Sequence, residues 1–447
     1  MIRVPFLDGK QVAVMGLGRS GTATARALLD SGAAVLAWDD SEAARAAAAE
    51  AGIPIADLMS ADLSKVALMV WSPGIPHTHP EPHPVAERAR AAGIELVCDV
   101  ELLARARPGN RFVAVTGTNG KSTTTTLLAH VLAAGGLEVA AGGNLGTAAL
   151  DLPELGEGGI YVLELSSYQL ELVRSPTLAA AVLLNVTPDH LGRHGGLEGY
   201  VAAKRRLFDF LGPNGKAVIG IDDQHCTTIA QELLARGLDL AEISVEHYDA
   251  HVAAPDGTLR DEGREICDLA QLPQLPGRHN WQNACAVHAM ASALGLAPET
   301  IVAGLATYPG LAHRQELVAE INGVRYVNDS KATNADAAEK ALVCYENVHW
   351  IAGGQAKEGG IAALAPLFPR IARAYLIGEA AEQFAATLDG KVPFTVCHEL
   401  VTALSAAHNR AAPGEVVLLS PACASWDQFR SFEHRGDTFR QLVRGLA

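Results

Sequence analysis

The sequence VAVTGTNGKST at residues 113–123 constrains the fold more than any other stretch. An apolar run ends in two glycines, a lysine and a hydroxyl, and residues 124–134 continue with helical periodicity. This pattern predicts a strand, a loop and a helix that bind phosphate through loop N–H groups and the helix N-terminus. Lys121 would add a charge and Ser122 can coordinate Mg²⁺. Because the first glycine is Gly117 and residue 115 is Val, the loop is shorter than GxxxxGK[ST].

Length and charge limit the class of protein. A chain of 447 residues, 49% of them hydrophobic, can bury two or three cores. The net charge of -15 argues against a nucleic-acid or anionic membrane surface. Seven scattered cysteines without CxxC spacing fit a reducing compartment and predict neither disulfides nor a zinc site. Without a signal peptide or a long apolar span, we expect a soluble cytoplasmic protein.

A second glycine turn, GLGRSG at residues 16–21, lies between an apolar strand and a helix. The next strand ends at Asp39, so the pattern is typical of a unit that binds a nucleotide or diphosphate, with a carboxylate near a ribose. A turn whose glycines serve packing alone is the alternative. A further strand, 68–71, runs into Ser72, Pro73 and Gly74 at the carboxyl end of the sheet, where ligands bind. Three nearby histidines alternate with prolines, and we do not expect them to bind metal.

Two strand ends after the phosphate loop carry polar groups. The strand at 160–163 ends in Glu164, which could reach Mg²⁺ or could be an exposed strand-end glutamate. The strand at 180–184 leads to His190, which the residues alone mark only as a loop histidine, since Mg²⁺ seldom binds nitrogen. Lys204 begins a KRR run in a helix predicted over 197–211, which is typical of a solvated basic face.

The last third of the chain has its own pattern. Asn322-Gly323 between two apolar runs predicts a hairpin. Strands at 348–352, 375–377 and 416–419 each end in glycine or proline and precede a helix. The predicted fold is therefore α/β with three domains, each a doubly wound and mostly parallel sheet: Rossmann-like at 1–104, P-loop ATPase-like at 105–309 and Rossmann-like at 310–447.

Nine motifs in order resemble the Mur ligases from the first glycine turn to the last helix: TGTNGKST, GGNLG, LELSSYQLE, LNVTPDHL, GRHNWQNA, LAHRQE, NDSKATN, IAGGQAKEG and LLSPACASWDQF. Within the family, DSKATN and SPACAS are similar to the members that add D-glutamate. The resemblance implies an ATP-dependent amide ligase of cytoplasmic peptidoglycan precursor synthesis. Its substrates would be UDP-N-acetylmuramoyl-L-alanine and D-glutamate, its cofactors ATP and two Mg²⁺ ions, and its state a monomer that binds neither nucleic acid nor membrane.

The resemblance also implies roles for individual residues. The catalytic group would comprise Lys121, Glu164, His190 and Lys204. ATP would be bound by Gly117, Thr118, Asn119, Gly120, Lys121, Ser122, Thr123, Asn280, Arg314, Asp329 and Lys331. Mg²⁺ would be bound by Ser122, Glu164, His190 and Lys204, the last as a carbamate. The UDP-sugar substrate would contact Leu17, Gly18, Arg19, Ser20, Asp39, Ser72, Pro73, Gly74, Asn144 and His190. D-Glutamate would contact Thr333, Lys357, Ser425 and Phe432.

Three other functions are weighed against this one. A nicotinamide oxidoreductase would use the first glycine turn and Asp39 but leaves the phosphate loop unexplained. Another Mur-type or folylpolyglutamate-type amide ligase shares the ATP loop, although the folylpolyglutamate type lacks the first UDP-type unit. An ATP-driven switch is the third possibility, and it would hydrolyse ATP without both small substrates.

Overall fold

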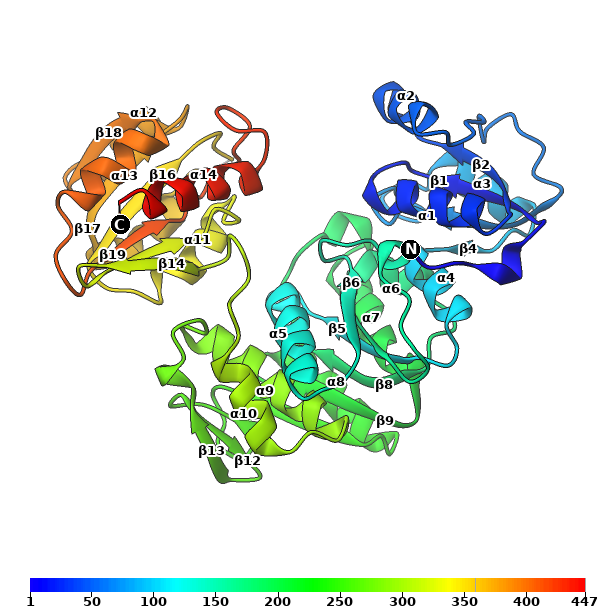
Figure 1. The fold of residues 1–447 in the computed structure, drawn as a ribbon, viewed down its shortest axis with the longest axis horizontal. Coiled ribbons are helices and arrows are strands. Elements are labelled where there is room, and N and C mark those ends of the chain that lie inside the picture. The colour runs from blue at the N-terminus through cyan, green and yellow to red at the C-terminus, as the bar shows by residue number, and fades with distance from the viewer. Residues whose placement is uncertain (358, 447) are drawn as a thin grey trace. The chain divides into compact units, whose positions relative to one another are not determined.

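The computed structural model describes residues 1–357 and 359–446, and these residues form three sheets (Figure 1). The chain divides into two compact units, 1–269 with 278–308, and 270–277 with 309–447. The first unit holds two sheets and the second holds one. This is the three-domain α/β architecture that the sequence predicts. The domain boundaries after residues 104 and 309 stay predictions. Within the described residues no helix is both long and apolar enough to cross a bilayer.

The first sheet is parallel, in the order β2-β1-β3-β4. Its strands are β1 (Gln11–Met15), β2 (Ala34–Trp38), β3 (Val66–Trp71) and β4 (Leu96–Val97). Its helices are α1 (Arg19–Asp30), α2 (Glu42–Glu50), α3 (Pro84–Ala91) and α4 (Asp99–Ala106). β1 is almost entirely buried because it has a neighbour on each side, and its carboxyl end feeds the first glycine turn.

The second sheet has nine strands in the order β13-β12-β11-β10-β9-β8-β5-β7-β6. Its strands are β5 (Arg111–Thr116), β6 (Val139–Gly143), β7 (Ile160–Glu164), β8 (Leu178–Leu183), β9 (Leu211–Gly220), β10 (Leu240–Ser244), β11 (Val252–Ala253), β12 (Thr258–Asp261) and β13 (Arg264–Asp268). Its main helices are α5 (Lys121–Ala134), α6 (Ser167–Leu172), α7 (Leu197–Arg205), α8 (Gln224–Ala235), α9 (Arg278–Ala293) and α10 (Pro298–Ala306). β5 is central and buried, so the phosphate loop rests on a fixed support.

Two predictions for this sheet need correction. The helix predicted over 197–211 ends at Arg205 and continues as a 3₁₀ helix, η4 (Arg206–Phe210). The sequence did not predict the antiparallel extension of β11, β12 and β13 at the sheet edge. These strands are short and half-polar, so they lack the apolar runs that mark the buried strands.

The third sheet has the order β14-β15-β19-β16-β17-β18. Its strands are β14 (Glu316–Ile321), β15 (Val324–Asn328), β16 (Val348–Gly353), β17 (Ile371–Ile377), β18 (Phe394–His398) and β19 (Val416–Leu419). Its helices are α11 (Ala335–Leu342), α12 (Ala381–Leu388), α13 (Leu400–His408) and α14 (Phe432–Arg444). β14 and β15 form the predicted antiparallel hairpin, with Asn322 and Gly323 both at positive φ, and the other pairs are parallel.

Candidate active site

The loop between β5 and α5 is a cradle that only glycine can form at two points. Gly120 has φ of +83°, and a Cβ there would lie 2.4 Å from Asn283 Oδ1. Gly117 has φ of +157°, and its Cβ would lie 3.0 Å from Leu184 Cβ. The Lys121 ammonium donates to the carbonyls of Gly117 at 2.9 Å and Thr118 at 2.8 Å, so it lies over the loop. This is the local geometry expected for phosphate binding.

Asparagine side chains fix this cradle from both sides. The backbone N–H of Asn119 donates to Oδ1 of Asn185 at 2.9 Å, and Asn185 lies on the loop that follows β8. The Thr124 hydroxyl donates to Asn283 Oδ1 at 3.0 Å, and Asn283 Nδ2 donates to Asn280 Oδ1 at 3.1 Å. Asn280, predicted to contact ATP, is therefore linked to the start of α5. The sequence alone marks no role for Asn185 or Asn283, because their partners lie far away along the chain.

Glu164 ends β7, which pairs directly with β5. Its side chain is buried, and Oε1 accepts from Asn144 Nδ2 at 2.6 Å. Among the described residues Oε2 has no hydrogen-bond partner although it is buried. A buried carboxylate oxygen is costly without a partner, so this atom is suited to a cation. The alternative of an exposed strand-end glutamate is wrong.

His190 lies on the loop that follows β8, the other neighbour of β5. It has φ of 52°, its side chain is 52% exposed, and Nε2 is 3.4 Å from Asp189 Oδ2. Tyr168 lies beside it, with ring centroids 5.2 Å apart. The histidine is thus at the expected sheet edge and open to ligands.

Lys204 is buried, and its ammonium donates to the Gly117 carbonyl at 2.7 Å. The interpretation of this lysine as part of a solvated basic face is therefore wrong, because its side chain reaches from α7 to the phosphate loop. Burial, and then the charge of Lys121, lowers the pKa of Lys204 to about 7. A substantial fraction of this amine is neutral near neutral pH.

The first glycine turn lies beside its predicted partners. A Cβ at Gly16 would lie 2.4 Å from Ser72 Cβ, so the turn packs closely on the end of β3. The Leu17 amide donates to Asp39 Oδ2 at 2.7 Å. Gly18 caps α1 and residues 19 and 20 begin it, so these predicted substrate residues share one sheet edge with residues 72–74.

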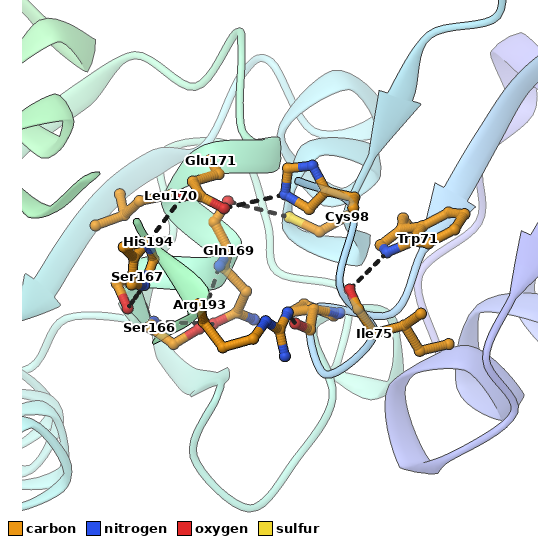
Figure 2. A network of polar contacts seen from close by, with 12 residues as sticks. Trp71, Ile75, Cys98, Ser166, Ser167, Gln169, Leu170, Glu171, Arg193 and His194 are labelled. Carbon is orange, nitrogen blue, oxygen red and sulfur yellow. Dashed lines mark hydrogen bonds and ion pairs between the residues drawn. The ribbon is translucent and has the colours of Figure 1, made fainter. Parts of the chain in front are cut away.

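Glu171 joins the first sheet's loops to the second sheet's loops, in a network drawn in Figure 2. His194 Nδ1 donates to Glu171 Oε1 at 2.8 Å, and His77 Nε2 donates to Oε2 at 3.0 Å. Arg90 donates to His77 Nδ1 at 3.1 Å, which leaves Nε2 as the donor. The expectation that the histidine-proline loop binds no metal is not tested, but His77 is occupied by protein partners.

This network predicts a pH dependence of stability. Burial raises the pKa of Glu171, but the hydrogen bonds from His194 and His77 outweigh it and lower the pKa from 4.5 to about 2. At pH values above its unfolded-state pKa, the carboxylate thus contributes on the order of 3 kcal/mol to the free energy of unfolding. This contribution is lost as the pH falls from about 4.5 toward 2. Urea unfolding of wild type and Glu171→Gln should show a stability difference that narrows below about pH 4.5. A difference independent of pH would contradict this account.

In the second unit, three residues predicted to contact ATP or glutamate follow β15 or begin α14. Asp329 is buried and accepts from the Ser420 hydroxyl at 2.7 Å, and burial raises its pKa to about 7. The Lys331 ammonium lies 3.8 Å from the centroid of the Phe432 ring. Arg314 precedes β14 and is exposed.

The other residues predicted to bind the substrate D-glutamate lie on the loops after β15, β16 and β19. Ser425 is buried, Thr333 is half-buried and Lys357 is exposed. The backbone N–H of Gln355 donates to the Ala424 carbonyl at 2.9 Å, and this bond brings the loops of Lys357 and Ser425 together. The second unit therefore gathers the residues predicted to bind D-glutamate on adjacent loops at one sheet edge.

Arg435 is a buried residue that the sequence analysis missed. Its guanidinium donates to the Ser330 hydroxyl and carbonyl, both at 2.9 Å, and to the Cys423 carbonyl at 3.0 Å. It thus ties together the loops that carry Lys331 and Ser425. Nothing in the pattern of α14 distinguishes this arginine from the exposed ones.

Strand, glycine cradle and helix place the chain in the class of P-loop proteins with an α/β fold. Three family descriptions match it: MurD-like N-terminal domain at 10–98, Mur ligase middle domain at 115–291 and the Mur ligase glutamate ligase domain at 313–423. The chain belongs to the Mur ligase family.

Curated relatives match over the whole length. The chain is 68% identical to UDP-N-acetylmuramoylalanine--D-glutamate ligase of Paramagnetospirillum magneticum, covering 100% of this chain and 99% of the relative. It is 54% identical to the protein of the same name from Rhodospirillum rubrum, covering 98% and 95%. Among solved structures, the MurC ligase of Thermotoga maritima has a TM-score of 0.61 at 18% identity, covering 98% of this chain and 100% of that one. The MurF ligase of Thermotoga maritima in complex with ADP has 0.58 at 18%, covering 100% and 98%, and both show the fold alone.

Proposed function

We propose that this Mur ligase uses ATP to join D-glutamate to UDP-N-acetylmuramoyl-L-alanine in cytoplasmic peptidoglycan precursor synthesis. The observation that carries the proposal is the meeting of the phosphate loop, Glu164 and Lys204 around the carboxyl ends of β5 and β7. The names of the full-length relatives support the choice of substrates.

Each residue set supplies one part of the reaction. Lys121 and the loop N–H groups would hold the triphosphate, and the γ-phosphoryl group would pass to a carboxylate oxygen of the alanyl end, releasing ADP. The amine of D-glutamate would attack the resulting acyl phosphate at its carbonyl carbon, expelling phosphate and losing a proton. Lys121 and the loop dipoles would stabilise the negative charge that builds up on oxygen in both steps.

Mg²⁺ fits the oxygen donors around the cradle. Glu164 Oε2, which has no hydrogen-bond partner among the described residues, offers a buried carboxylate ligand, and Ser122 in the first turn of α5 offers a hydroxyl. Lys204 would join this set as a carbamate, and its lowered pKa supports the attack of a neutral amine on CO₂. His190 completes the proposed pair of sites. When bound, two ions would neutralise charge on the transferring phosphoryl group.

The substrate residues of both units keep the roles that the resemblance implies. The first turn and residues 72–74 would hold the UDP-sugar, with Asn144 and His190 at its alanyl end. Lys357 suits the side-chain carboxylate of glutamate, beside Thr333, Ser425 and Phe432. We propose that the enzyme acts as a monomer.

A phosphate-release assay tests the function directly. Purified protein with Mg²⁺, ATP and UDP-N-acetylmuramoyl-L-alanine should release phosphate with D-glutamate and far less with L-glutamate. Phosphate release without an amino acid would favour an ATP-driven switch, and turnover of a folate substrate would favour the folylpolyglutamate-type alternative. Binding of a pyridine dinucleotide without any phosphate release would favour the oxidoreductase.

Lys357→Ala should mainly weaken glutamate binding. We expect KM for D-glutamate to rise about tenfold or more with little change in kcat, because the charge acts equally on bound substrate and transition state. Steady-state kinetics at saturating ATP measure both constants. Lys340→Ala, an exposed lysine on α11, is the matched control. An unchanged KM would remove Lys357 from the glutamate site.

A further inference from the structure

A cavity of about 440 Å³ lies in the first unit, and Glu171 and His77 of the network described above form part of its wall. It is bordered by α3, β4, α6 and η4, and its polar lining includes His77, Thr78, Arg90, Glu171, Arg174 and Arg206. None of the residues that line it belongs to the substrate or metal sets proposed above.

The balance of charge in this cavity is positive because its carboxylates are already paired. Glu95 accepts from both terminal nitrogens of Arg105, at 3.0 and 2.7 Å. Glu171 accepts from His77 and His194 through both oxygens. Among the described residues, Arg90, Arg174 and Arg206 form no ion pair with a carboxylate. Three such guanidinium groups around one cavity are unexpected in a chain of net charge -15.

Backbone carbonyls hold two of these guanidinium groups in place. Arg206 Nε donates to the Leu170 carbonyl at 3.0 Å, and Arg174 Nη1 donates to the Glu171 carbonyl at 2.8 Å. A guanidinium has five donors, so each arginine keeps others for a ligand. Burial, and then the charge of Arg174, lowers the pKa of Arg206. A bound anion would offset both effects, because it stabilises the charged form of the guanidinium.

We propose that this cavity binds a phosphate-class oxyanion. Planar guanidinium groups match the geometry of phosphate oxygens and bind them through paired hydrogen bonds. Because the cavity is larger than one phosphate ion, it also has room for a small phosphate monoester. The ligand is therefore either inorganic phosphate or such a monoester, bound through its phosphate group. The site is separate from the P-loop and does not depend on turnover.

Calorimetric titration of the full chain tests the site. The protein is first saturated with Mg²⁺ and a non-hydrolysable ATP analogue, then titrated at fixed ionic strength with inorganic phosphate or with glycerol 3-phosphate. We expect one equivalent to bind, and Arg90→Gln and Arg174→Gln each to weaken binding about tenfold. Both side chains are exposed, so the variants should fold, which circular dichroism checks. Arg26→Gln, an exposed arginine on α1, is the control and should bind as wild type does.

The outcomes separate the two sources of the anion. Tighter binding of the monoester would identify a phosphorylated metabolite as the ligand, and equal binding would identify free phosphate. Absence of binding to wild type, or equal affinity in wild type, Arg90→Gln and Arg174→Gln, would overturn the proposal. In a second measurement, phosphate in place of chloride at equal ionic strength should raise the melting temperature of wild type more than that of Arg174→Gln. Equal shifts would also overturn it.

Discussion

Lys121→Ala should abolish ligase turnover, with a loss of about a thousandfold or more in kcat. The ammonium lies over the cradle on two loop carbonyls, and a phosphoryl group in transfer would lose its nearest fixed positive charge from the protein. The assay is phosphate release with all three substrates at saturation.

The control for this variant is Lys65→Ala, an exposed lysine before β3, which should leave the rate unchanged. Because Lys121 also bonds to its own loop, the melting temperature without nucleotide must be compared with that of wild type. A folded Lys121→Ala protein with the wild-type rate would show that the loop does not hold the triphosphate.

Glu164→Gln should reduce kcat at least about a hundredfold and raise the Mg²⁺ concentration needed for half-maximal rate. The substitution keeps the shape of the side chain, and the amide oxygen can still accept from Asn144. What it removes is the charge of the buried oxygen that has no protein partner among the described residues. Turnover measured across a range of Mg²⁺ concentrations separates the two effects.

Glu157→Gln, on the exposed turn before β7, is the matched control and should behave as wild type. If Glu164→Gln were as active as wild type at every Mg²⁺ concentration, the carboxylate would have no role in metal binding. The buried oxygen would then need another partner.

The sequence predicted the parallel cores well because buried strands are continuous apolar runs that end in glycine, proline or a polar residue. β5, β7 and β8 are examples, and each directs its polar residues to one sheet edge. The hairpin of β14 and β15 was readable because Asn-Gly accepts positive φ.

What could not be predicted depends on contacts between distant segments. Lys204 reads as a surface charge, since burial depends on which face of α7 meets the phosphate loop. Arg435 and Glu171 have partners on loops far away in the sequence, and no local spacing marks them. The roles of the predicted site residues stay predictions, although the structure places the members of each unit on shared sheet edges.

Two hydrogen bonds between loops of the first and second sheets bear on which length of UDP-sugar substrate the enzyme would accept. Arg19 donates to the Gly146 carbonyl at 2.7 Å, and Arg193 donates to the Gly74 carbonyl at 2.7 Å. The first bond ties the start of α1 to the loop after β6, and the second ties the loop after β3 to the 3₁₀ turn at residues 191–193. With the substrate roles proposed above, a UDP-sugar whose spacer between pyrophosphate and carboxyl group is shorter or longer would not reach both the first glycine turn and the phosphate loop.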